Sequence, residues 1–246
     1  MNPEICRVFF SFLIAFACLA CAAPGHAAGR FSDWAAVVVA GDWHAHDGTP
    51  SEIFDNARRD VSADLLTLGF SRANIAQFSA RPNAPVDPAD ARSIGNALWD
   101  LTNRTSGGCF VYFSSHGARD GIVLGDAILL PRQLERMLAN SCADRPTVVV
   151  LSACFSGVFV PTLAAPNRMI LTAARADRTS FGCSQTDRYP YFDQCVLSVW
   201  GGAADFPGLA RAAQACVAKR EHDEHVGPPS EPQLWIGAEA DLPKWR

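Results

Sequence analysis

The sequence predicts an α/β domain in which a mostly parallel central sheet is flanked by helices. Short apolar runs rich in Val, Ile and Phe alternate with longer segments of helical period, which is the pattern of strands joined by crossover helices. The 246 residues, 49% hydrophobic and 19% charged, are enough for one substantial core. This composition excludes a short peptide, a disordered tail and a coiled coil.

Five apolar runs are expected to be the strands of this sheet, because helical segments separate them and parallel strands need such crossovers. After the third run, Ile122–Leu130 predicts a hairpin that turns at Gly125 and Asp126. A final apolar patch, Pro232–Gly237, predicts an edge strand. The five runs are Trp34–Ala40, Ile75–Phe78, Cys109–Ser114, Thr147–Ser152 and Met169–Ala173.

The helices are predicted from caps and from apolar residues at three- and four-residue steps. The first helix begins with a capping box at Thr49–Glu52, with proline at its first position, and ends at Gly69. The stretch Arg175–Tyr191 has no clear period, and a loop of this length in a compact domain is more often functional than structural. Further helices are expected over Ala89–Leu101, behind an acidic cap, and over Pro131–Leu138 and Pro207–Lys219.

The first 28 residues have the features of a secretory signal peptide. Val8–Ala23 is an apolar run of about 16 residues, and Pro24–Ala28 offers small residues for cleavage. The run is shorter than the roughly 20 residues that span a bilayer, so we expect export to the periplasm or the extracellular space without a stable membrane span. A lipid anchor on Cys21 is the weaker alternative, because the residues before it match the usual pattern poorly.

Residues 29–246 then form one domain, whose tail from about Gly227 is expected to be peripheral and a candidate for processing. The 21 basic and 25 acidic side chains give a net charge of −4, and only Lys219 and Lys244 are lysines. A protein that binds nucleic acid through phosphate contacts is therefore not expected.

Two strand ends carry the chemistry. The third strand runs into His116 and Gly117, and the fourth runs into Cys154. The carboxyl ends of parallel strands meet at one edge of a sheet, so neighbouring strands would bring the imidazole and the thiol together across 38 positions of sequence. A thiol and an imidazole within reach of each other form a nucleophile and a base.

These residues fit acyl transfer through a thioester. A helix starting near Phe155 would lower the pKa of the Cys154 thiol through its dipole. The imidazole of His116 would protonate the departing amine, and the amides of Gly117 and Cys154 would hold the oxyanion. Taken singly, each residue also fits a structural role, since a strand-end cysteine is often a small hydrophobe.

The strand ends resemble those of the legumain (asparaginyl endopeptidase) family of caspase-like cysteine peptidases. The resemblance rests on Ser-Ser-His116-Gly117 and on Ser-Ala-Cys154-Phe155-Ser156-Gly157, and it extends from about Val37 to Trp200. It implies a caspase-like three-layer sandwich and a cysteine endopeptidase that acts on peptides or proteins without a cofactor or metal. The family also contains transamidases and ligases, because an amine can resolve the thioester in place of water.

The resemblance further implies cleavage after Asn, less often after Asp. The family's specificity pocket is built from the first strand end and from the loop after the fifth strand. The matching positions here are His46, Asp47, Ser180 and Asp193. Arg175 and Arg178 in the same loop would instead favour an acidic substrate side chain, because a guanidinium pairs well with a carboxylate. The family's Arg-His pair at the first strand end is not present in residues 42–47.

Two alternatives remain open. A catalytically silent caspase-like domain would bind proteins without cutting them. A zinc-dependent hydrolase would use His44, His46 and Asp47, or the polar run Glu221–His225. No glycine-rich phosphate loop is present, so nucleotide chemistry has no support.

The nine cysteines divide unevenly. Three leave with the leader, and if Cys154 stays free, five remain, so at least one more thiol is unpaired within the chain. We expect Cys109 to bridge Cys142 at the base of the sheet and Cys183 to bridge Cys195 across the specificity loop. Cys216 is then left over.

Overall fold

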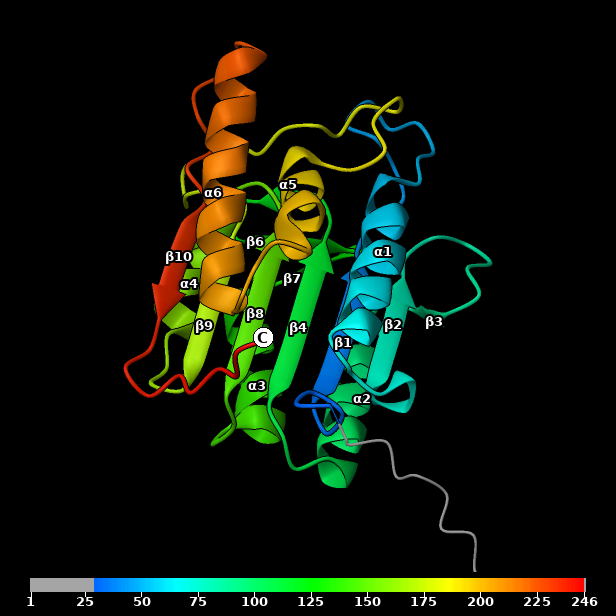
Figure 1. The fold of residues 1–246 in the computed structure, drawn as a ribbon. Coiled ribbons are helices and arrows are strands. Elements are labelled where there is room, and N and C mark those ends of the chain that lie inside the picture. The colour runs from blue at the N-terminus through cyan, green and yellow to red at the C-terminus, as the bar shows by residue number, and fades with distance from the viewer. Residues whose placement is uncertain (1–28, 246) are drawn as a thin grey trace, which may run out of the picture.

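A seven-stranded sheet forms the centre of the computed structural model, which describes residues 29–245. Its strand order is β10-β9-β8-β4-β1-β2-β3, and every pair is parallel except β10 with β9 (Figure 1). All five predicted strands and the predicted edge strand are confirmed. The bounds are β1 Ala35–Ala40, β2 Ile75–Ser79, β3 Asp87–Pro88, β4 Cys109–Ser114, β8 Thr147–Ser152, β9 Arg168–Thr172 and β10 Gln233–Ile236.

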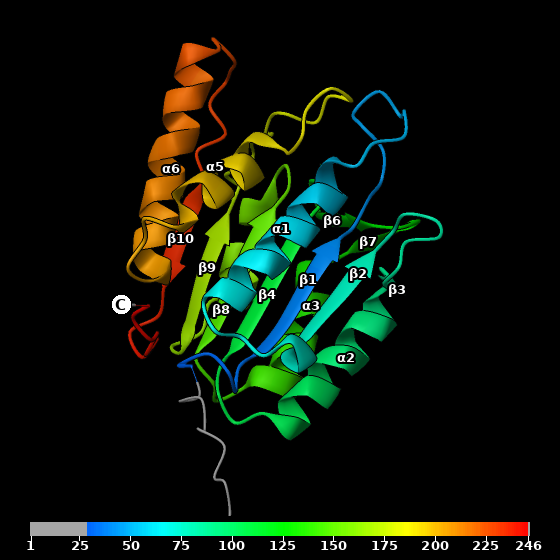
Figure 2. The same ribbon diagram turned by 45° about the vertical axis from the view of Figure 1, so that its right-hand side comes forward.

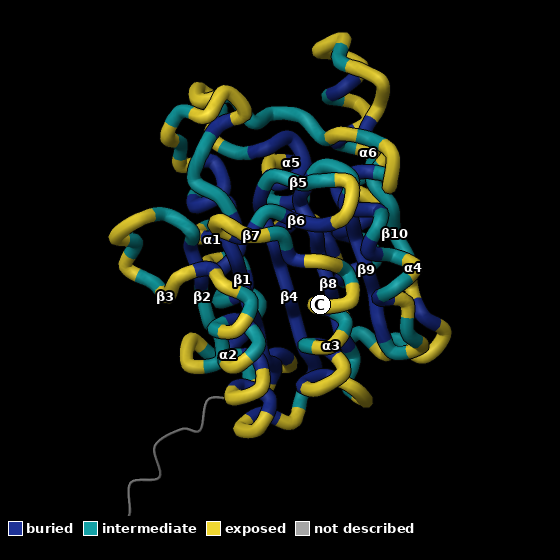
Figure 3. Tube along the Cα trace, turned by 180° about the vertical axis from the view of Figure 1, so that it is seen from behind, coloured by how far each residue is buried: buried dark blue, intermediate teal, exposed yellow. Residues whose placement is uncertain are grey.

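Helices cover both faces of the sheet, which confirms the three-layer α/β sandwich (Figures 1 and 2). Successive strand residues point to opposite faces. Val38 therefore packs in the core beneath one helical layer, and Val37 and Val39 pack in the core beneath the other. The central strands are buried along their length (Figure 3). One layer holds α1 (Ile53–Thr67), α5 (Tyr191–Trp200) and α6 (Phe206–Asp223), and the other holds α2 (Ala91–Arg104), α3 (Pro131–Cys142) and α4 (Val160–Leu163).

The helix caps agree with the sequence at α2 and differ at α1. The carboxylate of Asp90 accepts hydrogen bonds from two backbone amides of the first turn of α2, as the acidic cap predicts. The predicted capping box at Thr49–Glu52 is wrong, because α1 begins at Ile53 and Glu52 at its N-cap makes no capping bond. The Thr49 hydroxyl donates instead to the carboxylate of Asp47, 2.6 Å away, and does not cap the helix.

The hairpin and the polar loop border the carboxyl ends of the strands. β5 (Gly117–Ala118), β6 (Gly121–Leu124) and β7 (Ala127–Leu129) form a small antiparallel sheet, and its second turn confirms the predicted hairpin. The loop 175–190 runs across the same end of the molecule and leads into α5, a helix that the sequence analysis missed.

The tail beyond Gly227 is part of the fold, in contrast to the peripheral segment expected from the sequence. β10 closes one edge of the sheet, and the Trp245 ring stacks on that of Trp200 with centroids 5.5 Å apart. Ser230 is fully buried, and both its amide and its hydroxyl donate to the buried carboxylate of Glu221. Processing at Gly227 would remove a strand and these contacts.

One disulfide is as predicted and the other is not. Cys109 is bonded to Cys142 and ties β4 to the end of α3. The expected pair of Cys183 with Cys195 is wrong, because Cys195 is bonded to Cys216 and ties α5 to α6. Cys195 lies in a helix, and its side chain faces α6 and not the loop. Cys154 and Cys183 are the free cysteines of the described chain.

The predicted leader, residues 1–28, lies outside the described residues. Among the helices that are described, none combines the length and the hydrophobicity that crossing a membrane requires.

Candidate active site

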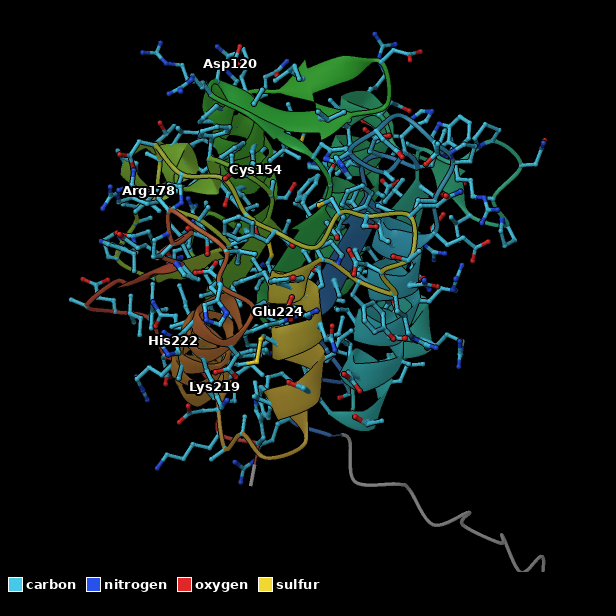
Figure 4. The ribbon with its side chains drawn as sticks, turned by 90° about the horizontal axis from the view of Figure 1, so that it is seen from above. Asp120, Cys154, Arg178, Lys219, His222 and Glu224 are labelled. Atoms are coloured by element: carbon cyan, nitrogen blue, oxygen red, sulfur yellow. A yellow bond between two sulfur atoms is a disulfide. The ribbon has the colours of Figure 1, made fainter. Side chains whose placement is uncertain are left out.

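The register of β4 and β8 brings His116 and Cys154 to the same end of the sheet. Ser114 and Ser152 are paired across the two strands, and each is the last residue of its strand. His116 and Cys154 each follow two residues later, so both leave the sheet at the same level. Figure 4 looks down on this end, where Cys154 lies near Asp120 of the hairpin and Arg178 of the loop, while Lys219 and His222 of α6 lie apart.

The backbone of Gly117, which follows His116, packs directly against the backbone of Cys154. A Cβ atom placed on Gly117 would lie 1.9 Å from the carbonyl oxygen of Cys154, 2.8 Å from its carbonyl carbon and 2.9 Å from its nitrogen. Real side chains do not approach a backbone so closely, so this position requires glycine. The main chains of the residue after His116 and of Cys154 are therefore in contact.

The imidazole of His116 is oriented from two sides. Its Nε2 donates to the carbonyl oxygen of His44 at 3.1 Å, and its ring packs edge to face on Phe54 with centroids 5.0 Å apart. When Nε2 carries the proton in this bond, Nδ1 is the free nitrogen of the neutral ring. The segment of His44 is itself held by Asp42, whose carboxylate accepts from the amide of His44 and lies 2.8 Å from its Nδ1.

The thiol of Cys154 is half-buried and contacts the loop after β9. The amide of Ser180 donates to its sulfur at 3.2 Å. Burial raises the pKa of the Cys154 thiol, and the hydrogen bond from Ser180 opposes this by favouring the thiolate. The expected lowering by a helix dipole is wrong: a 3₁₀ turn, Ser156–Phe159, and the four-residue α4 follow the cysteine in place of a long helix.

A cavity of about 330 Å³ is lined mainly by the loop 175–190, and one of its lining residues, Ser180, contacts the sulfur of Cys154. His46 and Ser180, two of the predicted substrate-binding residues, line it. His46 joins the two loops around it, because its amide and its Nδ1 both donate to the carbonyl oxygen of Cys183, at 2.9 and 3.1 Å. The other seven lining residues were not predicted to bind substrate, and two of them, Cys183 and Asp187, are polar residues of the aperiodic loop that belong to no motif.

Asp47 and the predicted arginines lie outside this cavity. Asp47 is exposed, and its carboxylate accepts from the amide and the hydroxyl of Thr49, which lowers its pKa. Arg175 is paired with Asp177 and Glu231 at the edge of the loop. These contacts order the loops that surround the cavity, and they leave the Arg175 charge already neutralised.

Asp193 lies beneath the strand ends and not at the surface, which differs from the position expected of a residue that contacts substrate. Its side chain is fully buried and accepts hydrogen bonds from the hydroxyls of Tyr112, Ser114 and Ser152, the last two at 2.8 and 2.7 Å. Burial raises the pKa of Asp193 to about 6, although the three hydroxyls favour the charged form. Asp193 thus ties α5 to the ends of β4 and β8, two residues before His116 and Cys154.

The side chains proposed as zinc ligands do not converge on a common point. His44 faces Asp42, His46 faces the Cys183 carbonyl, and His222 and His225 lie at the end of α6. In the part of the chain that the structure describes, no group of three or more His, Cys, Asp or Glu side chains is arranged to hold a metal ion.

The comparisons with known proteins agree with this geometry. The model of the peptidase C13 family matches residues 89–213, which include His116, Cys154, Ser180 and Asp193. The chain belongs to the peptidase C13 family. The resemblance to legumain-type cysteine endopeptidases is therefore confirmed, and the protein is a cysteine-type peptidase that acts on protein substrates.

The fold is that of caspases. The chain matches the crystal structure of caspase-1 from Spodoptera frugiperda with a TM-score of 0.62 and 16% sequence identity, over 91% of this chain and 94% of that chain. At this identity the match shows the fold, and it confirms the predicted caspase-like sandwich. No curated protein sequence matches the chain.

Proposed function

We propose that this C13 peptidase is an exported endopeptidase in which Cys154 is the nucleophile and His116 the general acid and base. The observation that carries the proposal is the contact of Gly117 with the backbone of Cys154, because it holds the two catalytic segments together at the strand ends. Since burial raises the pKa of the Cys154 thiol, a base is needed to remove its proton. The proposed base is Nδ1 of His116, because Nε2 is bonded to the His44 carbonyl.

The reaction then proceeds in two halves. The thiolate of Cys154 attacks the scissile carbonyl carbon, and the oxyanion is held by the amides of Gly117 and Cys154. The carbon–nitrogen bond breaks as the imidazolium of His116 gives its proton to the leaving amine. The imidazole then takes a proton from water as the water oxygen attacks the thioester carbon. The carbon–sulfur bond breaks, the carboxylic acid leaves, and the imidazolium returns the proton to the sulfur of Cys154.

The cavity lined by the loop 175–190 is proposed to take the side chain before the scissile bond, and its lining favours Asn over Asp. Asp187 is the one carboxylate among the lining residues, and no arginine or lysine faces it. An Asn amide donates to such a carboxylate and to Nε2 of His46, which is an acceptor because Nδ1 carries the proton that bonds the Cys183 carbonyl. An Asp side chain would meet a like charge at Asp187.

Export is supported by the two disulfides, because such bonds persist in oxidising compartments. Residues 1–28 are proposed to be removed as a signal peptide. N-terminal sequencing of the protein recovered outside the cytoplasm tests this, and a mature chain that retains its first residues contradicts it.

Cleavage of fluorogenic peptides that end in Asn, Asp, Arg or Ala tests the catalytic proposal. Wild-type protein is expected to prefer Asn, and Cys154→Ala to be inactive on all four. Equal turnover by the two proteins contradicts the assignment of Cys154. Asp187→Asn is expected to raise the rate on Asp peptides relative to Asn peptides, because it removes the repelling charge. An unchanged ratio contradicts the assignment of the cavity.

A further inference from the structure

Arg119 lies on the side of the site that would receive the leaving group, and the proposed mechanism does not use it. His116 gives its proton to the departing amine, so the substrate residues after the scissile bond lie on the His116 side of Cys154, away from the 330 Å³ cavity. The chain that continues from His116 is the hairpin of β5 and β6, whose two-residue turn is Arg119 and Asp120. Figure 4 labels Asp120 in this turn. This argument rests on the proposed function.

Arg119 lies over the residue that follows the nucleophile. The central carbon of its guanidinium is 5.1 Å from the centroid of the Phe155 ring, which is within the range of a cation–π contact. Phe155 has a φ of 57°, a left-handed backbone that residues other than glycine rarely adopt. Its amide donates to the Arg178 carbonyl at 2.8 Å and its own carbonyl accepts from Val158 at 3.0 Å, so the ring stands on a fixed backbone.

The charge of Arg119 is unpaired. In residues 29–245 its exposed guanidinium forms no ion pair and no hydrogen bond, and its neighbour Asp120 is exposed without an ion pair to it. Arg175, by contrast, is neutralised by Asp177 and Glu231. A guanidinium that rests on an aromatic ring keeps its edge free, and its fork of donors matches the two oxygens of a carboxylate.

We propose that Arg119, held over Phe155, binds the carboxylate of an Asp or Glu in the first two substrate residues after the scissile bond. Arg119 is then a specificity-determining residue on the leaving-group side, and the Asn cavity determines specificity on the other side. The position of the arginine, one residue beyond the Gly117–Ala118 strand that abuts Cys154, puts its charge within a residue or two of the bond that is cut.

Peptide binding to the uncleaving Cys154→Ala protein tests this. Two peptides share Asn before the scissile position and differ only in Glu or Gln at the two positions after it. The Glu peptide is expected to bind about fivefold more tightly at about 0.01 M salt, in the range of a partly exposed ion pair, and the preference is expected to shrink at about 0.5 M salt. Adding Arg119→Gln to the Cys154→Ala protein is expected to remove the preference for the Glu peptide, and adding Arg119→Glu is expected to reverse it.

Arg72→Gln is the matched control. Arg72 is exposed and precedes β2, at the opposite end of the sheet, so this variant changes the net charge equally and is expected to keep the preference. Equal binding of the two peptides to Cys154→Ala overturns the proposal, and so does a preference that survives Arg119→Gln. If the wild-type protein cuts neither peptide while the preference persists, the proposed cleavage after Asn fails and the carboxylate site stands.

Discussion

Gly117→Ala tests the contact on which the proposed active site depends. The added Cβ would lie 1.9 Å from the Cys154 carbonyl oxygen, and such contacts in proteins stay above 3.0 Å, so the two backbones must separate by about 1 Å (3.0 − 1.9 Å). A displacement of that size between catalytic groups costs about a hundredfold in rate, equivalent to about 2.7 kcal/mol of transition-state stabilisation. We expect kcat/KM on an Asn peptide to fall by about this factor.

The assay compares cleavage of the fluorogenic Asn peptide with thermal unfolding of the same preparation. Gly95→Ala is the control, because its Cβ would meet only the Met137 side chain, at 3.5 Å, in the middle of α2. This variant is expected to be fully active and to gain about 0.5–1 kcal/mol of stability from its better helix propensity. A folded Gly117→Ala protein with activity within about threefold of wild type refutes the reasoning.

Three further variants test the ties around the site. Burial raises the pKa of Asp193 to about 6 from an ordinary 3.8, so the folded state binds protons more tightly than the unfolded state. The free energy of unfolding is therefore expected to fall by about 2 kcal/mol as the pH rises from about 4 to about 7. Asp193→Asn should remove that part of the slope in denaturant titrations at the two pH values, and an identical slope would contradict it. The double variant Cys195→Ala, Cys216→Ala opens a loop of 21 residues and should lose about 3 kcal/mol in the same titrations, with no loss contradicting the pairing. Ser230→Ala takes a hydroxyl from buried Glu221 and should lower Tm by the equivalent of about 1–3 kcal/mol, whereas an unchanged Tm would show that this tie contributes nothing.

The strands, and the placement of His116 and Cys154 at one end of the sheet, could be predicted from sequence because their signals are local. Each buried strand is a continuous apolar run, and His116 and Cys154 follow their runs directly. The parallel register then converts equal distances along two strands into proximity in space. Thr49 shows the limit of such signals, since a hydroxyl that fits a helix cap is used by Asp47 in the preceding turn.

The elements that escaped prediction depend on contacts between distant segments. α5 is short and largely buried, so it lacks the polar face that marks an amphipathic helix in a sequence. The pairing of Cys195 with Cys216 follows from the packing of α5 on α6, which spacing alone does not reveal. The family resemblance predicts a substrate-binding position for Asp193, and only the fold shows that its carboxylate lies beneath two strand ends.

Asp193 and Cys195 both lie on α5, and this helix fixes the loop 175–190 relative to the ends of β4 and β8. α5 begins directly after the loop whose Ser180 amide contacts the Cys154 sulfur. Within its first turn Asp193 bonds to the ends of β4 and β8, and two residues later Cys195 is bonded to Cys216 of α6. A shift of α5 would therefore move the loop that lines the cavity relative to the thiol. Neither Cys154 nor His116 lies on α5, yet this helix fixes the position of the loop and its cavity relative to both residues.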